Sequence, residues 1–129
     1  MDGNTNAGSY DIFLVKYNSS GTKQWTKQSS TSGKSYGKEV TVDSAGNIYV
    51  TGATSSGLDG NTHIGNYDIF LTKYNSSGAR QWTKQFGTSS ADWGQGVTVD
   101  SAGNIYVAGQ TGGVLDGNTS AGSHDFFIA

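Results

Sequence analysis

Three copies of a polar phrase, DGNTxxGxxD, supply the side chains most suited to binding a metal ion. Each copy offers carboxylate and amide oxygens. The full set is Asp2, Asn4, Asp11, Asp59, Asn61, Asp68, Asp116, Asn118 and Asp125. Calcium takes six to eight oxygen ligands, and glycine-rich loops allow backbone carbonyls to join them. The phrase therefore makes calcium a candidate ligand, although it lacks the sixth-position glycine and the twelfth-position glutamate of an EF-hand loop.

The same phrase also has a structural interpretation, which the sequence favours. Asp59 and Asn61 can form Asx-turns, and Asp68 can accept backbone N–H bonds where a strand begins. A zinc site is not expected, because His63 and His124 occupy different positions of the phrase and zinc needs three or four converging ligands. We therefore expect no cofactor, with calcium as the alternative.

A second candidate site is aromatic. Tyr36 and Trp93 occupy the same repeat position, and Ser35 or Asp92 precedes them. A ring beside polar groups can stack on a sugar while its neighbours form hydrogen bonds. The candidate glycan-binding residues are Tyr36, Asp92, Trp93 and His63. The favoured alternative is that each ring wedges between adjacent repeat units.

Both motifs recur because the chain is a tandem repeat. The same 57-residue spacing separates Asp2 from Asp59 and Asp59 from Asp116. Repeats of this length usually form solenoids or propellers, in which one unit cannot bury its faces alone. The long links of the repeat are expected at one end of the strands, where binding groups usually lie.

Each repeat predicts four β-strands in an antiparallel meander. They are expected at 12–17, 23–28, 40–42 and 48–50, with copies at 69–74, 80–85, 97–99 and 105–107. The link DSAGN predicts a hairpin in which Asp43 bonds the backbone two residues on and Gly46 takes a positive φ. The run IFLV predicts a strand covered on both faces, and KQWTKQ predicts an exposed edge.

Composition excludes several classes of protein. The 129 residues carry a net charge of −2 and are only 33% hydrophobic, without cysteine or proline. No basic face for nucleic acid, no apolar run long enough to span a membrane and no disulfide framework is visible. No nucleophile motif or phosphate loop stands out either. The sequence thus predicts a turn-rich, all-β protein without enzymatic activity.

The pattern GVTVDSAGNIYVAG, followed after a long loop by DIFLTKYNSSGARQWTKQFG, resembles the bacterial seven-bladed β-propeller repeat, SBBP, and more distantly the NHL propeller repeat. The resemblance implies four-stranded blades with VTVD innermost and QWTKQ outermost. It also implies a binding or scaffold role, often in exported or cell-surface proteins, and supplies no catalytic residues. The first residues, MDGNTNAGSY, do not resemble a signal peptide, so localisation is left open.

The chain holds about two blades. The expected segments are 1–36, with the third and outer strands of a split blade, 37–93, with a complete blade and connection, and 94–129, with inner, second and partial third strands. Unpaired edges promote association, so we expect copies to assemble head-to-tail into a ring, a trimer with six blades or a tetramer with eight. The C-terminal segment DFFIA of one copy and the N-terminal segment DIFLVKY of the next would then compete for the same third-strand position. A piece of a longer repeat array and an engineered chain are the alternatives.

Overall fold

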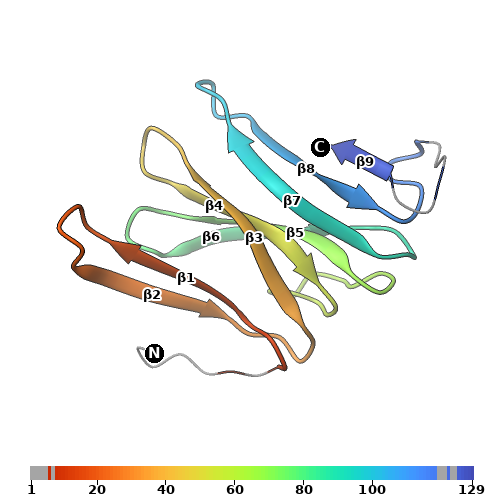
Figure 1. The fold of residues 1–129 in the computed structure, drawn as a ribbon, viewed down its shortest axis with the longest axis horizontal. Coiled ribbons are helices and arrows are strands. Elements are labelled where there is room, and N and C mark those ends of the chain that lie inside the picture. Colours follow the sequence, from red (N-terminus) through yellow and green to blue (C-terminus); the bar gives the residue numbers. More distant parts are fainter. Residues whose placement is uncertain (1–5, 7, 119–121, 123–124) are drawn as a thin grey trace.

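The computed structural model describes residues 6, 8–118, 122 and 125–129. Their regular structure consists of three antiparallel sheets (Figure 1). Among these residues, no helix has the length and apolar character needed to span a membrane. The strands are β1 (Ile12–Tyr17) and β2 (Lys23–Ser29) in the first sheet, β3 (Ser35–Val42), β4 (Ile48–Thr54), β5 (Asp68–Tyr74) and β6 (Arg80–Phe86) in the second, and β7 (Asp92–Val99), β8 (Ile105–Thr111) and β9 (Asp125–Ile128) in the third.

The middle sheet is a complete four-stranded blade. Its strands lie in chain order, β3-β4-β5-β6, and each pairs antiparallel with the next. On β5, Ile69 and Phe70 are fully buried although their side chains point to opposite faces of the sheet. Strand β6 is exposed or half-buried along its length. The predicted meander, with a covered third strand and a more exposed outer strand, is confirmed.

The hairpin link DSAGN folds as its sequence predicts. Asp43 Oδ1 accepts a hydrogen bond from Ala45 N at 3.0 Å, and Gly46 has a φ of 84°. In the second copy, Asp100 Oδ1 accepts from Ala102 N at 2.9 Å. The Asx contact and the left-handed glycine together fix the turn between the inner and second strands.

The inner strands β3 and β7 begin before their apolar VTV runs. Ser35 N donates to Tyr10 O, and Asp92 N donates to Tyr67 O, each at 2.8 Å. These bonds tie the start of each inner strand to the sheet before it. The strands consequently start five residues ahead of the starts expected at 40 and 97.

Tyr36 and Trp93 lie within β3 and β7. The strands expected at 40–42 and 97–99 placed both residues in the links before them, and that placement is wrong. Pairing continues past them through a bulge between Gly37 and Glu39, and through a matching bulge in β7. A Cβ at Gly52 would lie only 1.8 Å from Tyr36 O, so the close approach of the two strands requires a glycine there.

Two apolar clusters lie between neighbouring sheets. Propeller blades pack face to face in this way, since no single blade has a core of its own. The cluster between the first and middle sheets contains Ile12, Ile48, Val50, Leu58, Phe70 and Tyr74, with Leu14 and Trp25 packed against it. The cluster between the middle and third sheets contains Tyr49, Ile69, Leu71, Val97 and Val107, with Trp82, Phe86 and Phe127 among the residues packed against it.

Candidate functional site

Four aromatic rings contact one another from sheet to sheet near the long loops. We call Tyr10, Tyr36, Tyr67 and Trp93 the aromatic row. The ring centroids of Tyr36 lie 5.6 Å from Tyr10, 6.1 Å from Tyr67 and 5.8 Å from Trp93. Tyr67 and Trp93 are closer still, at 4.6 Å. Because Tyr36 and Trp93 pack on rings from adjacent sheets, the arrangement supports the wedge interpretation over a free platform for sugar stacking.

The aromatic row also makes polar interactions, one with a lysine and one between two of its tyrosine hydroxyls. Lys38 Nζ lies 5.7 Å from the centroid of the Trp93 ring, within cation–π range. Desolvation raises the pKa of the Tyr36 hydroxyl, and a hydrogen bond with Tyr67 raises it further. Tyr36 therefore stays a neutral hydroxyl at physiological pH.

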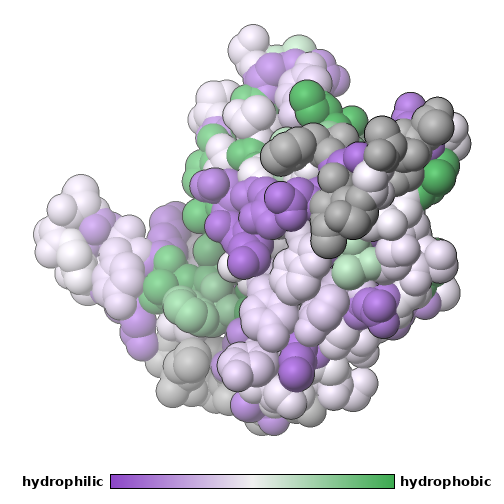
Figure 2. All heavy atoms as spheres, turned by 45° about the vertical axis from the view of Figure 1, so that its right-hand side comes forward, coloured by the Kyte–Doolittle hydropathy of each residue, from purple (hydrophilic) through white to green (hydrophobic). Residues whose placement is uncertain are grey.

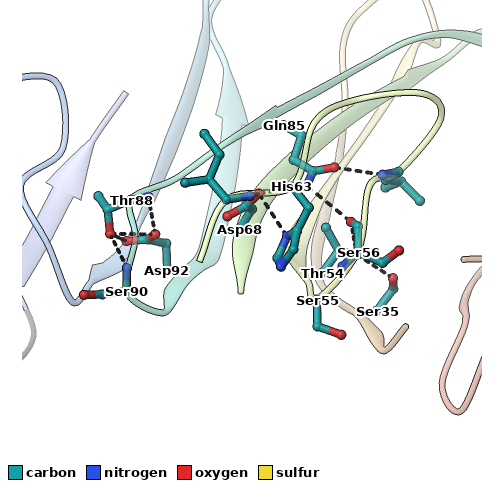
Figure 3. Close-up of polar contacts among 12 residues, drawn as sticks. Ser35, Thr54, Ser55, Ser56, His63, Asp68, Gln85, Thr88, Ser90 and Asp92 are labelled. Carbon is teal, nitrogen blue, oxygen red and sulfur yellow. Dashed lines mark hydrogen bonds and ion pairs between the residues drawn. The ribbon is translucent and has the colours of Figure 1, made fainter. Parts of the chain in front are cut away.

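Asp68, the first residue of β5, is fully buried. Its Oδ2 accepts hydrogen bonds from Gln85 Nε2 and Ile64 N, both at 2.8 Å, and contacts His63 Nδ1 at 3.1 Å (Figure 3). The backbone bond from Ile64 is the contact that the structural interpretation of Asp68 predicts. His63 thus lies beside Asp68 and is not in the aromatic row.

Gln85 on β6 connects the long β4–β5 loop to the outer strand, and we call this set of contacts the Gln85 bridge. Its Nε2 donates to Asp68 Oδ2 and, at 3.2 Å, to Ser56 O. Its Oε1 accepts from Leu58 N at 2.8 Å. One side chain therefore fixes both ends of the loop that carries the DGNT phrase.

Asp92 begins β7 and is also fully buried. Thr88 N donates to Asp92 Oδ2 at 2.6 Å, and the Thr88 and Thr111 hydroxyls donate to the same carboxylate. Consecutive strand residues point to opposite faces, so the Asp92 carboxylate is enclosed while the Trp93 ring lies in the aromatic row. The Asp92 carboxylate and the Trp93 ring therefore lie in different surroundings.

The DGNT phrase folds as a backbone turn. Asn61 N donates to Leu58 O at 3.0 Å, and Asp59 and Gly60 have φ values of 53° and 82°. Positive φ at both central positions defines a type I′ turn. The expectation of an Asx-turn at Asp59 is therefore wrong, because the backbone itself closes the turn.

The side chains of this turn point to β6. The Asp59 carboxylate contacts Arg80 and Thr83. Asn61 Nδ2 donates to Leu58 O at 2.8 Å and to Thr83 O at 3.2 Å. The described part of the chain has no group of three or more His, Cys, Asp or Glu residues that could hold a metal ion. The contacts thus separate Asp59 and Asn61 from Asp68.

The described residues of the other two DGNT copies repeat contacts or positions of the middle copy. Asn118 N donates to Leu115 O at 3.0 Å, and Asp116 has a φ of 51°. Asp11 accepts from Gln28 Nε2 at 3.0 Å, and Asp125 is the first residue of β9. Asp2 and Asn4 lie outside the described residues.

Sequence reasoning missed Gln85 and the Thr88–Asp92–Thr111 group. Comparison of the two copies could have found the first, because Gln28 and Gln85 occupy the same repeat position and both bond the third-strand aspartate. The same comparison could have identified the Thr88–Asp92–Thr111 group, because Asp92 stands at the repeat position that Ser35 occupies in the first copy.

Antiparallel sheets that recur with the sequence period and pack face to face define a β-propeller type of protein. Residues 24–59 and 81–116 match the SBBP family, described as a beta-propeller repeat. Because these two matches cover more than half of the chain, the chain belongs to the SBBP family.

Two relatives extend over most or all of the chain. An uncharacterized WD repeat-containing protein of Acanthamoeba polyphaga mimivirus is 29% identical over 126 residues, covering 84% of this chain and 9% of its own length. Regulatory protein FlaEY of Caulobacter vibrioides is 28% identical over a 140-residue alignment, covering 100% of this chain and 15% of its own length. The chain thus spans less than a sixth of either relative.

Proposed function

We propose that this chain is a non-enzymatic propeller unit that assembles head-to-tail with copies of itself into a closed ring, a trimer or a tetramer, and that the ring is a structural or binding scaffold. The observation that carries the proposal is that the same apolar strand surface is covered at one sheet junction and bare at the next.

That surface belongs to the VTV run of the inner strands. On β7, which contacts β3 and β4 of the middle sheet, Val97 is only 8% exposed. On β3, Val40 and Val42 are 48% and 56% exposed, because no described inner strand precedes them. Burial of an exposed valine side chain contributes roughly 1.5–3 kcal/mol. A neighbouring inner strand would supply this stabilisation.

A groove marks the position of the strands that would cover β3. It has a volume of about 460 Å³ and lies between β1 and β3, where Leu14, Val40 and Val50 contribute to its lining. Figure 2 shows hydrophobic surface in the hollow beside the left-hand lobe, the side where Figure 1 places β1 and β2. In the middle sheet, β5 pairs with β4 on one side and with β6 on the other. Strand β1 is the repeat copy of β5, and among the described strands it pairs with β2 alone, so the position of a second strand beside it is open. The groove therefore fits the inner and second strands of another copy, which are β7 and β8.

The third sheet offers the complementary surface. A polar cavity of about 320 Å³ lies beside β9, and Thr111, Leu115 and Asn118 contribute to its lining. In the middle sheet the equivalents of Leu115 and Asn118 are Leu58 and Asn61, which bond Gln85 and Thr83 of the outer strand. Strand β2 carries Gln28 at the repeat position of Gln85. We propose that β2 of a second copy supplies this outer strand.

In the assembled blade, β1 of the second copy would take the position of β9. β9 pairs with β8 at four residue positions, whereas β5 pairs with β4 at seven. The longer β1 strand therefore gains more backbone hydrogen bonds than β9 loses. We propose that β9 is displaced on assembly.

A binding role, as opposed to catalysis, agrees with the packing at the long-loop end. There the buried carboxylates of Asp68 and Asp92 accept hydrogen bonds from loop and strand groups of the protein itself. The names of the relatives, a WD repeat-containing and a regulatory protein, are compatible with binding.

The test is the absolute mass by light scattering after size-exclusion chromatography. We expect one species at three or four times the 13.5 kDa of the chain. Val40→Lys introduces a charge into the groove and should give a folded monomer. Ile64→Lys is the matched control, since Ile64 is equally exposed at 48% but lines neither cavity; its mass should match the unmodified chain. A monomeric unmodified chain would overturn the ring and assign the bare surface to further repeats of a longer polypeptide.

A further inference from the structure

We infer that the junction between the middle and third sheets binds one hard metal cation between the carboxylates of Asp68 and Asp92, with Ca²⁺ as the probe. This site differs from the set Asp59, Asn61 and Asp68 suggested by the DGNT phrase, and it does not depend on ring assembly. Figure 3 shows Asp68 between the Thr88–Asp92 group and the His63–Gln85 group.

The two carboxylates both approach Gly87 closely. A Cβ placed on Gly87 would lie 2.7 Å from Asp68 Oδ1 and 2.9 Å from Asp92 Oδ2. Both aspartates are fully buried. Both oxygens thus pack against the same glycine and lie no more than 5.6 Å apart, close enough for one cation to bridge them.

One of those oxygens has no hydrogen-bond partner. Asp68 Oδ2 carries all of the contacts described for this carboxylate, whereas Oδ1 is buried and accepts no hydrogen bond. A buried polar atom without a partner destabilises the fold, and more so when it is charged. A bound cation would satisfy Oδ1 directly.

The charge at the junction points to the same conclusion. Among the described residues, His63 is the basic residue that pairs with Asp68, and no lysine or arginine of these residues forms an ion pair with Asp68 or Asp92. Buried charges are retained when they are paired or coordinate a metal. A cation between the two carboxylates supplies the missing positive charge.

The other junction of the chain provides an internal comparison. Asp11, Ser30 and Ser35 there occupy the repeat positions of Asp68, Gly87 and Asp92. Ser30 Oγ donates to Asp11 Oδ2 at 2.9 Å, and Ser35 brings no second carboxylate. The junction between the middle and third sheets thus has a glycine in place of this hydroxyl donor and an aspartate in place of a serine, and both changes favour a cation.

The ligand chemistry selects the class of ion. The facing groups are carboxylate oxygens, and neither cysteine nor a free imidazole is among them. Oxygen-only donors suit Ca²⁺, Mg²⁺ or Na⁺ rather than softer metals. Ca²⁺ is the informative probe because it tolerates irregular geometry and can complete its shell with water.

The experiment measures the melting temperature of the full chain with CaCl₂ and with EGTA, and Tb³⁺ luminescence excited through tryptophan. Trp93 follows Asp92 directly and can sensitise the ion. At a 100-fold excess over Kd, Ca²⁺ should raise Tm by about 5–10 °C. The double variant Gly87→Ser, Asp92→Ser reproduces the composition of the first junction, so it should fold but lose the Ca²⁺ shift and the Tb³⁺ signal.

Two further variants make the test decisive. Asp59→Asn should keep the Ca²⁺ response, which separates this site from the DGNT loop. The reciprocal double variant Ser30→Gly, Ser35→Asp should create a second site and double the Ca²⁺ stoichiometry in calorimetry. Absence of any response to Ca²⁺, Mg²⁺, Na⁺ or Tb³⁺ in the unmodified chain would overturn the inference. A Tm that rises only on acidification, and only while both carboxylates are present, would also overturn it and assign a shared proton.

Discussion

Gln85 Nε2 donates to Asp68 Oδ2 across 2.8 Å and so joins the outer strand of the middle sheet to the buried start of β5. The same amide group holds the β4–β5 loop through Leu58 and Ser56. The Gln85 bridge therefore couples both ends of the β4–β5 loop to β6, and its removal should destabilise all three parts.

Gln85→Ala should destabilise the protein by about 2–4 kcal/mol, because it leaves Leu58 N unsatisfied and removes a donor from a buried carboxylate. Chemical unfolding followed by tryptophan fluorescence measures the loss. Gln81→Ala is the matched control on the same strand, since Gln81 is exposed and its amide donates to Ala79 O, two residues away. Equal losses in the two variants would contradict the bridge.

Gly52→Ala should be strongly destabilising, by roughly 1–3 kcal/mol or more, because the added Cβ would overlap Tyr36 O at the bulge. Gly96→Ala tests the same exchange where an added Cβ meets nothing within 4 Å. Thermal unfolding should show a large drop in Tm for Gly52→Ala and a small change for Gly96→Ala. Similar Tm values would show that the bulge tolerates a side chain.

The two hairpin links predict a stability loss in acid. Hydrogen bonds from the Asn47 side chain lower the pKa of Asp43, and those from Asn104 lower the pKa of Asp100. A depressed pKa in the folded state adds stability above the unfolded value of about 3.9, and this stability is lost as pH falls through the folded value. Tm should therefore fall below about pH 4. The double variant Asp43→Asn, Asp100→Asn should melt lower at pH 7 and show a shallower acid dependence; an unchanged slope would exclude these links as the cause.

The contact between Tyr67 and Trp93 should be worth about 0.5–1.5 kcal/mol beyond the area that the rings bury. A double-mutant cycle with Tyr67→Leu and Trp93→Leu measures it as the coupling free energy of unfolding. Tyr17 provides the comparison, since it is 56% exposed and makes none of the described ring contacts. A Tyr17→Leu, Trp93→Leu cycle should give a value near zero, and a Tyr67 coupling equally near zero would contradict the packing role.

The repeat and its strands could be predicted because their signals are local. The alternation in VTV and IYV sets the strand faces, and Asp43 with Gly46 sets the turn within a few residues. The extension of β3 back to Ser35 could not be predicted in this way. SYGKE has no apolar alternation, and the extension depends on pairing with β4 and on the hydrogen bond to Tyr10.

The candidate site was predictable in its elements but not in its contacts. The DGNT phrase and the aromatic position were identified from residue type and repetition. Asp68, Gln85 and Thr88 come together only when the loop, the outer strand and the next sheet are packed, which no local pattern encodes. Because β7 begins at Asp92, strand alternation places the Asp92 and Trp93 side chains on opposite faces of the sheet.

The aromatic row has an optical consequence. Its rings meet at centroid distances of 4.6–6.1 Å and at interplanar angles between 30° and 49°. Transitions of chromophores held so close and at fixed skew couple to one another. The near-ultraviolet circular dichroism of the aromatic row should therefore depend on the twist from one sheet to the next, and it can be recorded without a label.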